Sequence, residues 1–161
     1  MSSYLETKQK ILKEFFQSLN GLREEGILVN KKDFTCQIGE WLVATIYSGN
    51  RAVSGIQKDW DIDIYGKRIQ VKAHAKASGN NNRWSAVNNE ITERVDELII
   101  VVFTFDYKLK EFYKIPWEEA IKHIRLRGKK KPRSEINWSH VKDYKQSLDS
   151  LPRQDIIQLF K

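Results

Sequence analysis

The stretch WDIDIYGKRIQVK, residues 60–72, alternates between apolar and polar side chains on both sides of a glycine. Alternation with a period of two residues predicts β-strands, and a glycine between two such runs predicts a tight turn. We therefore expect a β-hairpin with strands over 60–64 and 67–75. One face of this hairpin is wholly apolar and should face the core, with Ile62, Ile64, Ile69 and Val71. The other face carries polar groups: Asp61, Asp63, Gln70, Lys72 and His74.

The turn decides whether these polar groups meet. A two-residue turn, at Tyr65-Gly66 or at Gly66-Lys67, sets one of the two acids opposite Gln70 on the same face. A three-residue turn would instead separate the acids from the other polar groups. Glycine suits the primed turns of two-residue hairpins, so we expect the polar groups to converge.

The other elements follow from periodicity. Helical spacing of apolar residues predicts helices over 4–19, ended by Asn20-Gly21, and over 34–48, where Asp33 can cap the start. A continuous apolar run over 98–105 predicts a central strand buried on both faces. The remaining expected elements are a short strand (51–56), a helix (84–95), a return strand (111–115), a helix opened by Pro116 and ending near 125, a basic loop, a segment over 138–148 and a last helix opened by Pro152.

Hairpins flanked by helices indicate the fold class α/β (α+β), a mixed β-sheet with helices on both sides. No linker or internal repeat divides the 161 residues, so we expect one domain. Within it we expect an N-terminal helical extension (1–30), a motif-bearing core (31–125), and a basic loop with C-terminal helices (126–161).

The composition of the chain limits the chemical class of its binding partner. The net charge of +7 and the isoelectric point of about 9.4 favour a polyanion, and nucleic acid is the commonest one. The single cysteine, Cys36, excludes an internal disulfide. No apolar run reaches the length of a membrane span, and the N-terminus lacks the apolar core of a signal peptide. We therefore expect a cytoplasmic protein with no membrane partner.

Three short motifs follow one another along the chain: Gly39-Glu40 on the second helix, then Asp61-Ile62 and Gln70-Val71-Lys72 on the hairpin. In this order they resemble the PD-(D/E)XK nuclease superfamily, which has the restriction-endonuclease-like fold. The resemblance covers about residues 31–125. The chain departs from the superfamily pattern at two points. Gln70 stands where glutamate or aspartate is usual, which removes one anionic ligand, and no proline precedes the motif aspartate.

The resemblance implies a metal-dependent DNA endonuclease that hydrolyses phosphodiester bonds with Mg²⁺, for which Mn²⁺ can substitute. Such hydrolysis needs an activated water and positive charge against the phosphate, and Mg²⁺ held by oxygen ligands supplies both. The implied metal ligands are Asp61, Gln70, the backbone carbonyl of Val71, and Glu40. The implied catalytic residues are Asp61, Gln70, Glu40 and Lys72, the last of them beside the attacking water. Possible additional site residues are Asp63, an alternative to Asp61 as main ligand, and His74.

Because an amide attracts a cation more weakly than a carboxylate does, we expect activity to need millimolar Mg²⁺ or to prefer Mn²⁺.

Two segments are expected to bind nucleic acid. Residues 125–133 hold six basic side chains suited to phosphate contacts: Arg125, Arg127, Lys129, Lys130, Lys131 and Arg133. The segment after the hairpin can contact phosphates or read base edges through Lys76, Asn80, Asn81, Asn82 and Arg83. The expected partner is double-stranded DNA. Cutting both strands with one site per chain favours a homodimer or a higher homo-oligomer.

A small type II restriction-type enzyme is the predicted function, with a homing endonuclease or a junction resolvase on the same fold as alternatives. A non-catalytic nucleic-acid-binding module on a degenerate nuclease fold is a rival reading. Gln70 is its best argument, and Asp61, Lys72 and Glu40 argue against it. A subunit that meets an acidic protein would explain the charge but not the polar face of the hairpin.

Overall fold

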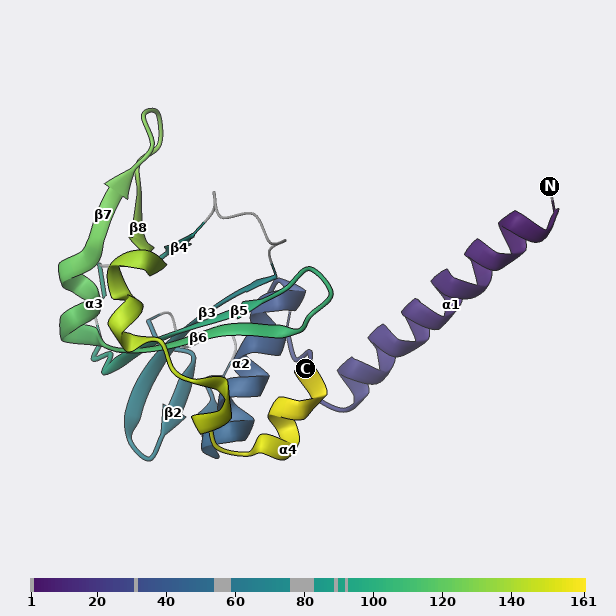
Figure 1. Cartoon of the computed structure of the whole chain (residues 1–161), viewed down its shortest axis with the longest axis horizontal. Coiled ribbons are helices and arrows are strands. Elements are labelled where there is room, and N and C mark those ends of the chain that lie inside the picture. Colours follow the sequence, from purple (N-terminus) through teal and green to yellow (C-terminus); the bar gives the residue numbers. More distant parts are fainter. Residues whose placement is uncertain (1, 31, 54–58, 76–82, 89, 92) are drawn as a thin grey trace.

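The computed structural model describes residues 2–30, 32–53, 59–75, 83–88, 90–91 and 93–161. A long N-terminal helix, α1 (Ser2–Glu24), projects away from a body built around a five-stranded sheet (Figure 1). The strand order is β1-β2-β3-β5-β6. Its strands are β1 (Asn50–Arg51), β2 (Ile62–Ile64), β3 (Lys67–Ala75), β5 (Glu97–Phe103) and β6 (Leu109–Pro116). The pair β3–β5 is parallel and the other pairs are antiparallel, so the sheet is mixed, as predicted.

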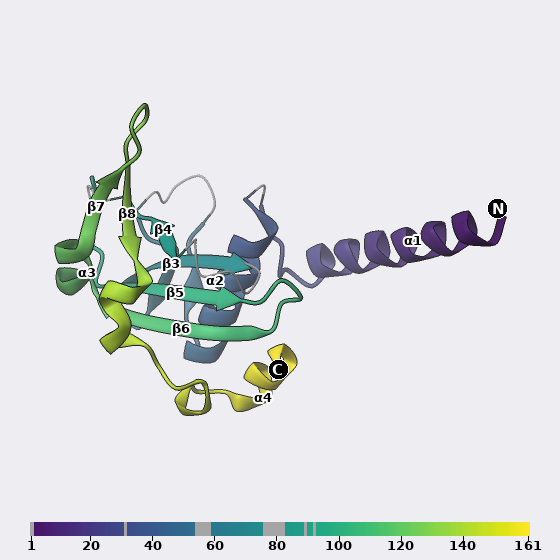
Figure 2. The same cartoon turned by 45° about the horizontal axis from the view of Figure 1, so that its top comes forward.

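Both faces of this sheet are covered. Helix α2 (Phe34–Tyr47) and the short C-terminal helix α4 (Gln154–Ile157) lie on one face (Figures 1 and 2). On the other face lie helix α3 (Trp117–His123), the 3₁₀ segment η2 (Trp138–Tyr144) and a second, three-stranded sheet in the order β4-β8-β7. This second sheet comprises β4 (Trp84–Ala86), β7 (Ile124–Arg127) and β8 (Arg133–Asn137). Two further 3₁₀ turns complete the chain, η3 (Leu148–Ser150) and η4 (Gln158–Phe160). The predicted α+β class with helices on both sides is confirmed.

The hairpin forms as the alternation predicts. Ile64 pairs with Lys67, so the turn consists of two residues, Tyr65 and Gly66. Their φ angles are +50° and +84°, the left-handed conformation that a primed turn requires at both positions. The apolar face points into the core, where Ile62 and Ile69 are fully buried.

Strand β5 is an interior strand of the sheet, between β3 and β6, and each of its residues from Leu98 to Phe103 is buried. Alternate side chains of this strand enter the two hydrophobic clusters on opposite faces. The predicted central strand is therefore confirmed, although it ends at Phe103 where Thr104–Lys108 turns the chain.

Helix α2 begins where predicted. The Asp33 carboxylate accepts hydrogen bonds from the backbone N–H groups of Thr35 and Cys36, at 2.9 and 3.4 Å. The helix ends at Ser48, which takes the left-handed conformation with φ +53°. Backbone N–H groups at this cap donate to the carbonyls of Ala44 and Thr45 in the last turn.

Three predicted elements differ from the structure. Helix α1 continues through Asn20-Gly21 to Glu24 and ends at a later glycine, because Gly26 takes the left-handed conformation and the N–H of Ile27 donates back to the carbonyl of Leu22. The predicted helix over 84–95 is wrong, because Trp84–Ala86 pairs with β8 as an edge strand. The predicted basic loop is shorter than expected, because strands β7 and β8 form a hairpin in which Arg127 pairs with Arg133, and only residues 128–132 connect them.

Two other predictions can be compared only with the part of the chain that the structure describes. The short strand expected over 51–56 is the two-residue β1, and residues 54–58 lie outside the described residues. Among the described residues, no helix combines the length and the apolarity that crossing a membrane requires.

Candidate active site

Two acidic side chains from distant parts of the chain meet beside the hairpin. Glu40 projects from the middle of α2 and is only 5% exposed, while Asp61 directly precedes β2. A single ammonium group joins them. Lys32 Nζ lies 2.8 Å from Glu40 Oε1 and 3.1 Å from Asp61 Oδ1. One cation therefore sits between two carboxylates that are 21 residues apart in the sequence.

The position of Asp61 is fixed by the backbone of the hairpin. Its N–H donates to the carbonyl of Ile69 at 2.8 Å, and its Oδ2 accepts from the N–H of Val71 at 2.8 Å. The carboxylate thus lies along β3 at the residue between Gln70 and Lys72. This is the place at which the sequence motif predicted a metal ligand.

Glu40 is brought to this place by close packing of α2 against β3. Gly39 faces Ala73, and a Cβ atom built on Gly39 would lie 2.3 Å from the Cβ of Ala73. Glycine therefore allows the helix to approach the sheet more closely than any other residue would. The pairing of glycine with glutamate in the motif has a steric reason in this fold.

The charges in this cluster are unevenly compensated. Burial, followed by repulsion from Asp61, raises the pKa of Glu40 above its ordinary value, although Lys32 and Arg51 oppose the shift. Burial works to lower the pKa of Lys32, but Asp61 and Glu40 outweigh it and raise that pKa. Arg51 contributes little direct pairing, since its Nη2 lies 3.8 Å from Glu40 Oε2. Glu40 is therefore a buried acid in a strained electrostatic setting, as is common at functional sites.

Gln70 is buried beside the chain segment that leads into Asp61. Its Nε2 donates to the carbonyl of Asp59 at 3.0 Å, and the residue is 3% exposed. Its Oε1 atom is buried and has no hydrogen-bond partner among the described residues. An unpaired buried carbonyl oxygen is unfavourable and is suited to bind a cation or a water.

These donors fit a hard divalent ion. Oxygen atoms are the ligands that Mg²⁺ prefers, and Glu40, Asp61 and the Oε1 atom of Gln70 supply them. Within the described ranges, no three His, Cys, Asp or Glu side chains gather as a metal site. The match is therefore one of chemical type: two carboxylates and the unpaired amide oxygen of Gln70 are oxygen ligands of the kind that Mg²⁺ accepts.

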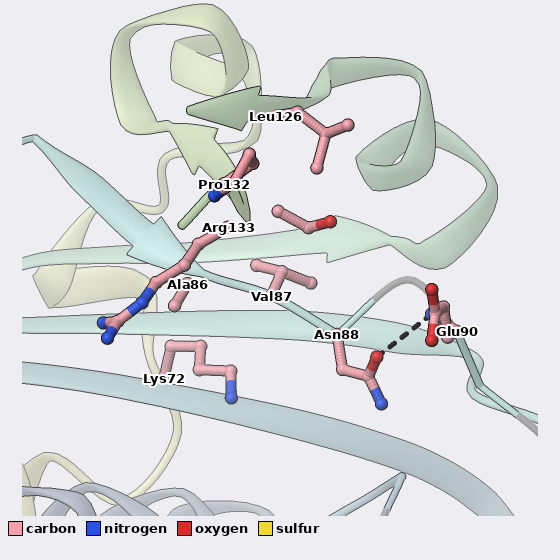
Figure 3. Close-up of a pocket in the computed structure, with 9 residues that line it drawn as sticks. Lys72, Ala86, Val87, Asn88, Glu90, Leu126, Pro132 and Arg133 are labelled. Atoms are coloured by element: carbon pink, nitrogen blue, oxygen red, sulfur yellow. Dashed lines mark hydrogen bonds between the residues drawn. The ribbon is translucent and has the colours of Figure 1, made fainter. Parts of the chain in front are cut away.

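Lys72 lies on β3, two residues after Gln70, and lines a cavity of about 400 Å³. The cavity is bounded by Lys72, Ala86, Val87, Asn88, Glu90, Leu126, Pro132, Arg133 and Ser134. Figure 3 shows the Lys72 side chain with Arg133 on one side and Asn88 on the other. The Lys72 ammonium also lies near enough to Cys36 on α2 to counteract, in part, the burial that raises the pKa of that thiol. Lys72 therefore lies between the helix of the acid cluster and the second sheet.

The other predicted site residues of the hairpin have local partners. The Asp63 carboxylate accepts from the N–H of Gly66 at 2.9 Å and so supports the turn. His74 Nε2 lies 2.6 Å from the hydroxyl of Ser85, and its ring packs against Trp138.

Predicted nucleic-acid contacts fall into three groups. Arg83 is engaged in the body, where it donates to Glu111 at 3.1 Å and to Tyr113 at 3.0 Å. Exposed side chains line the β7–β8 hairpin and its tip: Arg125, Arg127, Lys129, Lys130, Lys131 and Arg133. Lys76, Asn80, Asn81 and Asn82 lie outside the described residues.

The sequence analysis missed Lys32, the residue whose side chain contacts both acids. It lies in an irregular segment just before α2, and no spacing rule links position 32 to position 61. Its neighbour Asp33 was recognisable as a helix cap, but the direction of the Lys32 side chain is set by tertiary structure alone.

A comparison with models of known protein families and with curated proteins gives no match. The resemblance to the PD-(D/E)XK nuclease superfamily therefore rests on the motif residues of the sequence alone.

Proposed function

We propose that this protein is a metal-dependent DNA endonuclease that hydrolyses phosphodiester bonds. The observation that carries the proposal is the meeting of Glu40 and Asp61 at one ammonium group, 2.8 and 3.1 Å away, beside the Gln70-Val71-Lys72 strand. Two carboxylates held around one cation form a ready site for a divalent ion.

In this proposal Mg²⁺, or Mn²⁺ in its place, is held by Asp61, Glu40, the side-chain oxygen of Gln70 and the backbone carbonyl of Val71. When bound, the ion supplies positive charge to the phosphate and lowers the pKa of a bound water. Lys32 is half-exposed, with 47% of its side chain open to solvent, so it can swing outward when an ion enters. Lys72 donates to the attacking water or to a phosphate oxygen and stabilises the negative charge that develops there.

The exposed basic hairpin supports the choice of nucleic acid as substrate. Arg133 lines the same cavity as Lys72, and Lys129, Lys130 and Lys131 extend from it to the hairpin tip. A duplex bound along this hairpin would have its backbone next to Lys72. Phosphate contacts of this kind supply affinity without sequence choice.

Within this class, a small type II restriction-type enzyme is the role we favour. A homing endonuclease or a junction resolvase would use the same chemistry on a different DNA substrate.

The test is cleavage of a mixed panel of plasmid and phage DNA with Mg²⁺, Mn²⁺ or EDTA. We expect metal-dependent cutting that falls by roughly 100-fold or more in Asp61→Asn and Lys72→Ala. Lys122→Ala, which removes an exposed lysine that pairs with Glu119 on α3, is the matched control and should cut normally. Discrete fragments would indicate site-specific cutting, and a smear would indicate a nuclease with loose sequence choice.

A non-catalytic DNA-binding module is the second candidate. It is favoured by Gln70 in place of an acid and by Lys32, whose ammonium group already lies between the two carboxylates. DNA that is retarded in a gel but never cut, with any of these ions, would support this reading and contradict the nuclease.

A further inference from the structure

Helix α1 presents an apolar stripe that nothing in the described structure covers. Figures 1 and 2 both show the helix extending away from the body. Toward its C-terminal end, Phe15, Leu19 and Arg23 line an open cavity that they share with residues of the body such as Phe34 and Gln37. Five large apolar side chains on it are each between 52% and 59% exposed: Leu5, Ile11, Leu12, Phe15 and Phe16. Leu19 and Leu22, nearest the body, are partly buried.

Such a helix requires a partner. Helices in proteins gain most of their stability by packing an amphipathic face, and a projecting helix forgoes this. Monomeric soluble proteins also rarely expose large contiguous apolar patches. The stripe on α1 is therefore an interaction surface.

The spacing of the stripe identifies the partner. Its apolar positions are 5, 11, 12, 15, 16, 19 and 22, and Lys8 lies on the same face. With Lys8 included, the series of positions reads the same in both directions about the midpoint between residues 13 and 14. An antiparallel copy of the same helix would therefore set each stripe position against another one: Leu5 against Leu22, Lys8 against Leu19, Ile11 against Phe16, and Leu12 against Phe15. A two-fold interface requires this kind of self-complementarity.

We propose that α1 pairs antiparallel with α1 of a second copy of this chain. Positions 5, 12 and 19, together with 15 and 22, also have the seven-residue spacing of helices that pack along a seam. Lys8 interrupts the apolar seam but can lay its aliphatic stem over Leu19 of the second copy and keep its ammonium in water.

Charge and geometry agree with this choice. Helix α1 holds three acidic and four basic residues, so it carries little of the net +7 and does not repel a second copy strongly. A membrane-surface helix would instead carry a predominantly basic polar face. Because each helix joins its body at the C-terminal end, antiparallel pairing sets the two bodies apart by about 35 Å, the length of a 23-residue helix.

The paired stripes would bury on the order of 1,000 Å² over both copies, near the lower bound for a specific interface. The proposal does not depend on the nuclease activity, because it rests on α1 alone.

The first test is the mass in solution, measured by light scattering and by sedimentation over a range of concentrations. We expect twice the chain mass of 19.0 kDa for the unaltered protein. The Leu12→Glu/Phe15→Glu double variant should have half that mass and lose helix signal in circular dichroism. Gln17→Glu, on the opposite face of α1, is the matched control and should remain dimeric.

Two results would overturn the proposal: a monomer at every concentration, or a double variant that stays dimeric. A monomer that instead sediments with anionic phospholipid vesicles would overturn it as well.

The second test is orientation, in a Cys36→Ser background. Leu5→Cys chains mixed with Leu22→Cys chains should form mixed disulfides under mild oxidation by glutathione. Leu5→Cys alone should link poorly, because antiparallel pairing sets the two copies of position 5 about 25 Å apart. Efficient self-linking of Leu5→Cys would indicate parallel pairing and reject the antiparallel arrangement. Cleavage assays are not involved, so failure here leaves the proposed function untouched.

Discussion

Two buried glutamates of this protein have pKa values that move in opposite directions. Burial, aided by Asp61, raises the pKa of Glu40. Burial also acts to raise the pKa of Glu111, but hydrogen bonds from Arg83 and Lys145 outweigh it and lower that pKa. The Oε1 atom of Glu111 accepts hydrogen bonds from both Arg83 and Lys145, although its Oε2 atom has no hydrogen-bond partner among the described residues. Glu40 instead carries a charge that the fold accommodates poorly. The difference separates a candidate site residue from a core ion cluster.

This contrast predicts opposite effects of the same substitution. At neutral pH, Glu40→Gln should raise the free energy of unfolding by about 1 kcal/mol, and Glu111→Gln should lower it by about 2 kcal/mol. Urea denaturation of the two variants measures both effects, and each serves as the control for the other. Losses of similar size in both variants would show that Glu40 is an ordinary buried partner of Lys32.

The pH dependence of the folding stability follows from the same two pKa shifts. A raised pKa means that folded Glu40 binds more protons than the unfolded chain above the ordinary glutamate value, so its contribution to stability falls as the pH rises through that range. A lowered pKa means that the contribution of Glu111 is present above the ordinary value and is lost as the pH falls through its folded pKa. In Glu40→Gln, the fall in stability as the pH rises above the ordinary glutamate pKa should therefore be absent. In Glu111→Gln, the fall in stability as the pH drops through the folded pKa of Glu111 should be absent.

We predict that the Lys32 ammonium occupies, in the metal-free protein, the place of a divalent ion between Glu40 and Asp61. Lys32→Met leaves Glu40 and Asp61 facing each other without their shared cation, so the metal-free protein should lose about 1–2 kcal/mol, a value reduced for the half-exposed ammonium. Millimolar Mg²⁺ should then restore stability in Lys32→Met more than it stabilises the unaltered protein.

Thermal unfolding with Mg²⁺ and with EDTA measures this difference. Lys122→Met, at the exposed pair with Glu119, should show neither effect. Equal responses to Mg²⁺ in all three proteins would argue against a metal site between the two carboxylates.

At the scale of elements, the contact between α2 and β3 fixes the site. Gly39→Ala would force a methyl group to 2.3 Å from the Cβ of Ala73, so the helix must shift away from the sheet. We expect a loss of about 2–3 kcal/mol from such overpacking. Adding Ala73→Gly should recover much of that loss, because it removes the opposing methyl group, and a double-mutant cycle measures the coupling. If the two changes were simply additive, close packing at this point would not be the cause.

The hairpin turn offers a gain in stability. Tyr65 has φ +50° although its side chain is 87% exposed and so gains little from burial. Tyr65→Asn places a residue that tolerates this conformation at the first turn position, and should raise stability by about 0.5–1 kcal/mol. Tyr65→Val, which is stiffer at this φ, should lower it. Urea denaturation of both variants decides, and a gain in both would mean that backbone conformation is not what limits this turn.

The elements that the sequence predicts correctly are those whose signal is local. The 60–75 hairpin, its turn and the start of α2 at Asp33 depend on neighbouring residues, and the structure confirms them. Trp84–Ala86 is a strand because β8 lies beside it, and no local pattern reports a partner 50 residues away. The pairing of Arg127 with Arg133 in a strongly basic hairpin is also favoured by neighbours, since Arg127 packs 3.9 Å over the ring of Trp84.

The same distinction holds for the candidate site. Glu40, Asp61 and the Gln70-Val71-Lys72 run could be selected from order and spacing. Lys32 could not, because only the folded chain brings it between residues 40 and 61. That Asp63 supports the Tyr65-Gly66 turn is likewise visible only once the turn is built.

For the molecule as a whole, charge is distributed unevenly. The β7–β8 hairpin extends from one side of the body and α1 from another, as Figure 1 shows. The hairpin tip carries Lys129, Lys130 and Lys131 in succession, all exposed, whereas α1 is nearly balanced. A polyanion should therefore bind to the body at the hairpin and leave α1 free for a second copy.

Salt dependence tests where DNA binds. Each phosphate that a lysine neutralises adds about 0.9 to the slope of log affinity against log salt concentration. The Lys129→Gln/Lys130→Gln variant should therefore lower the magnitude of that slope by about 2 and weaken binding to all duplexes alike. Lys10→Gln/Lys13→Gln removes the same charge from the polar face of α1 and should leave the slope unchanged. Fluorescence anisotropy in EDTA measures binding without cleavage, so the result stands whether or not the protein cuts. Equal losses in both variants would mean that DNA responds to net charge alone, and the hairpin would then have no special part in binding.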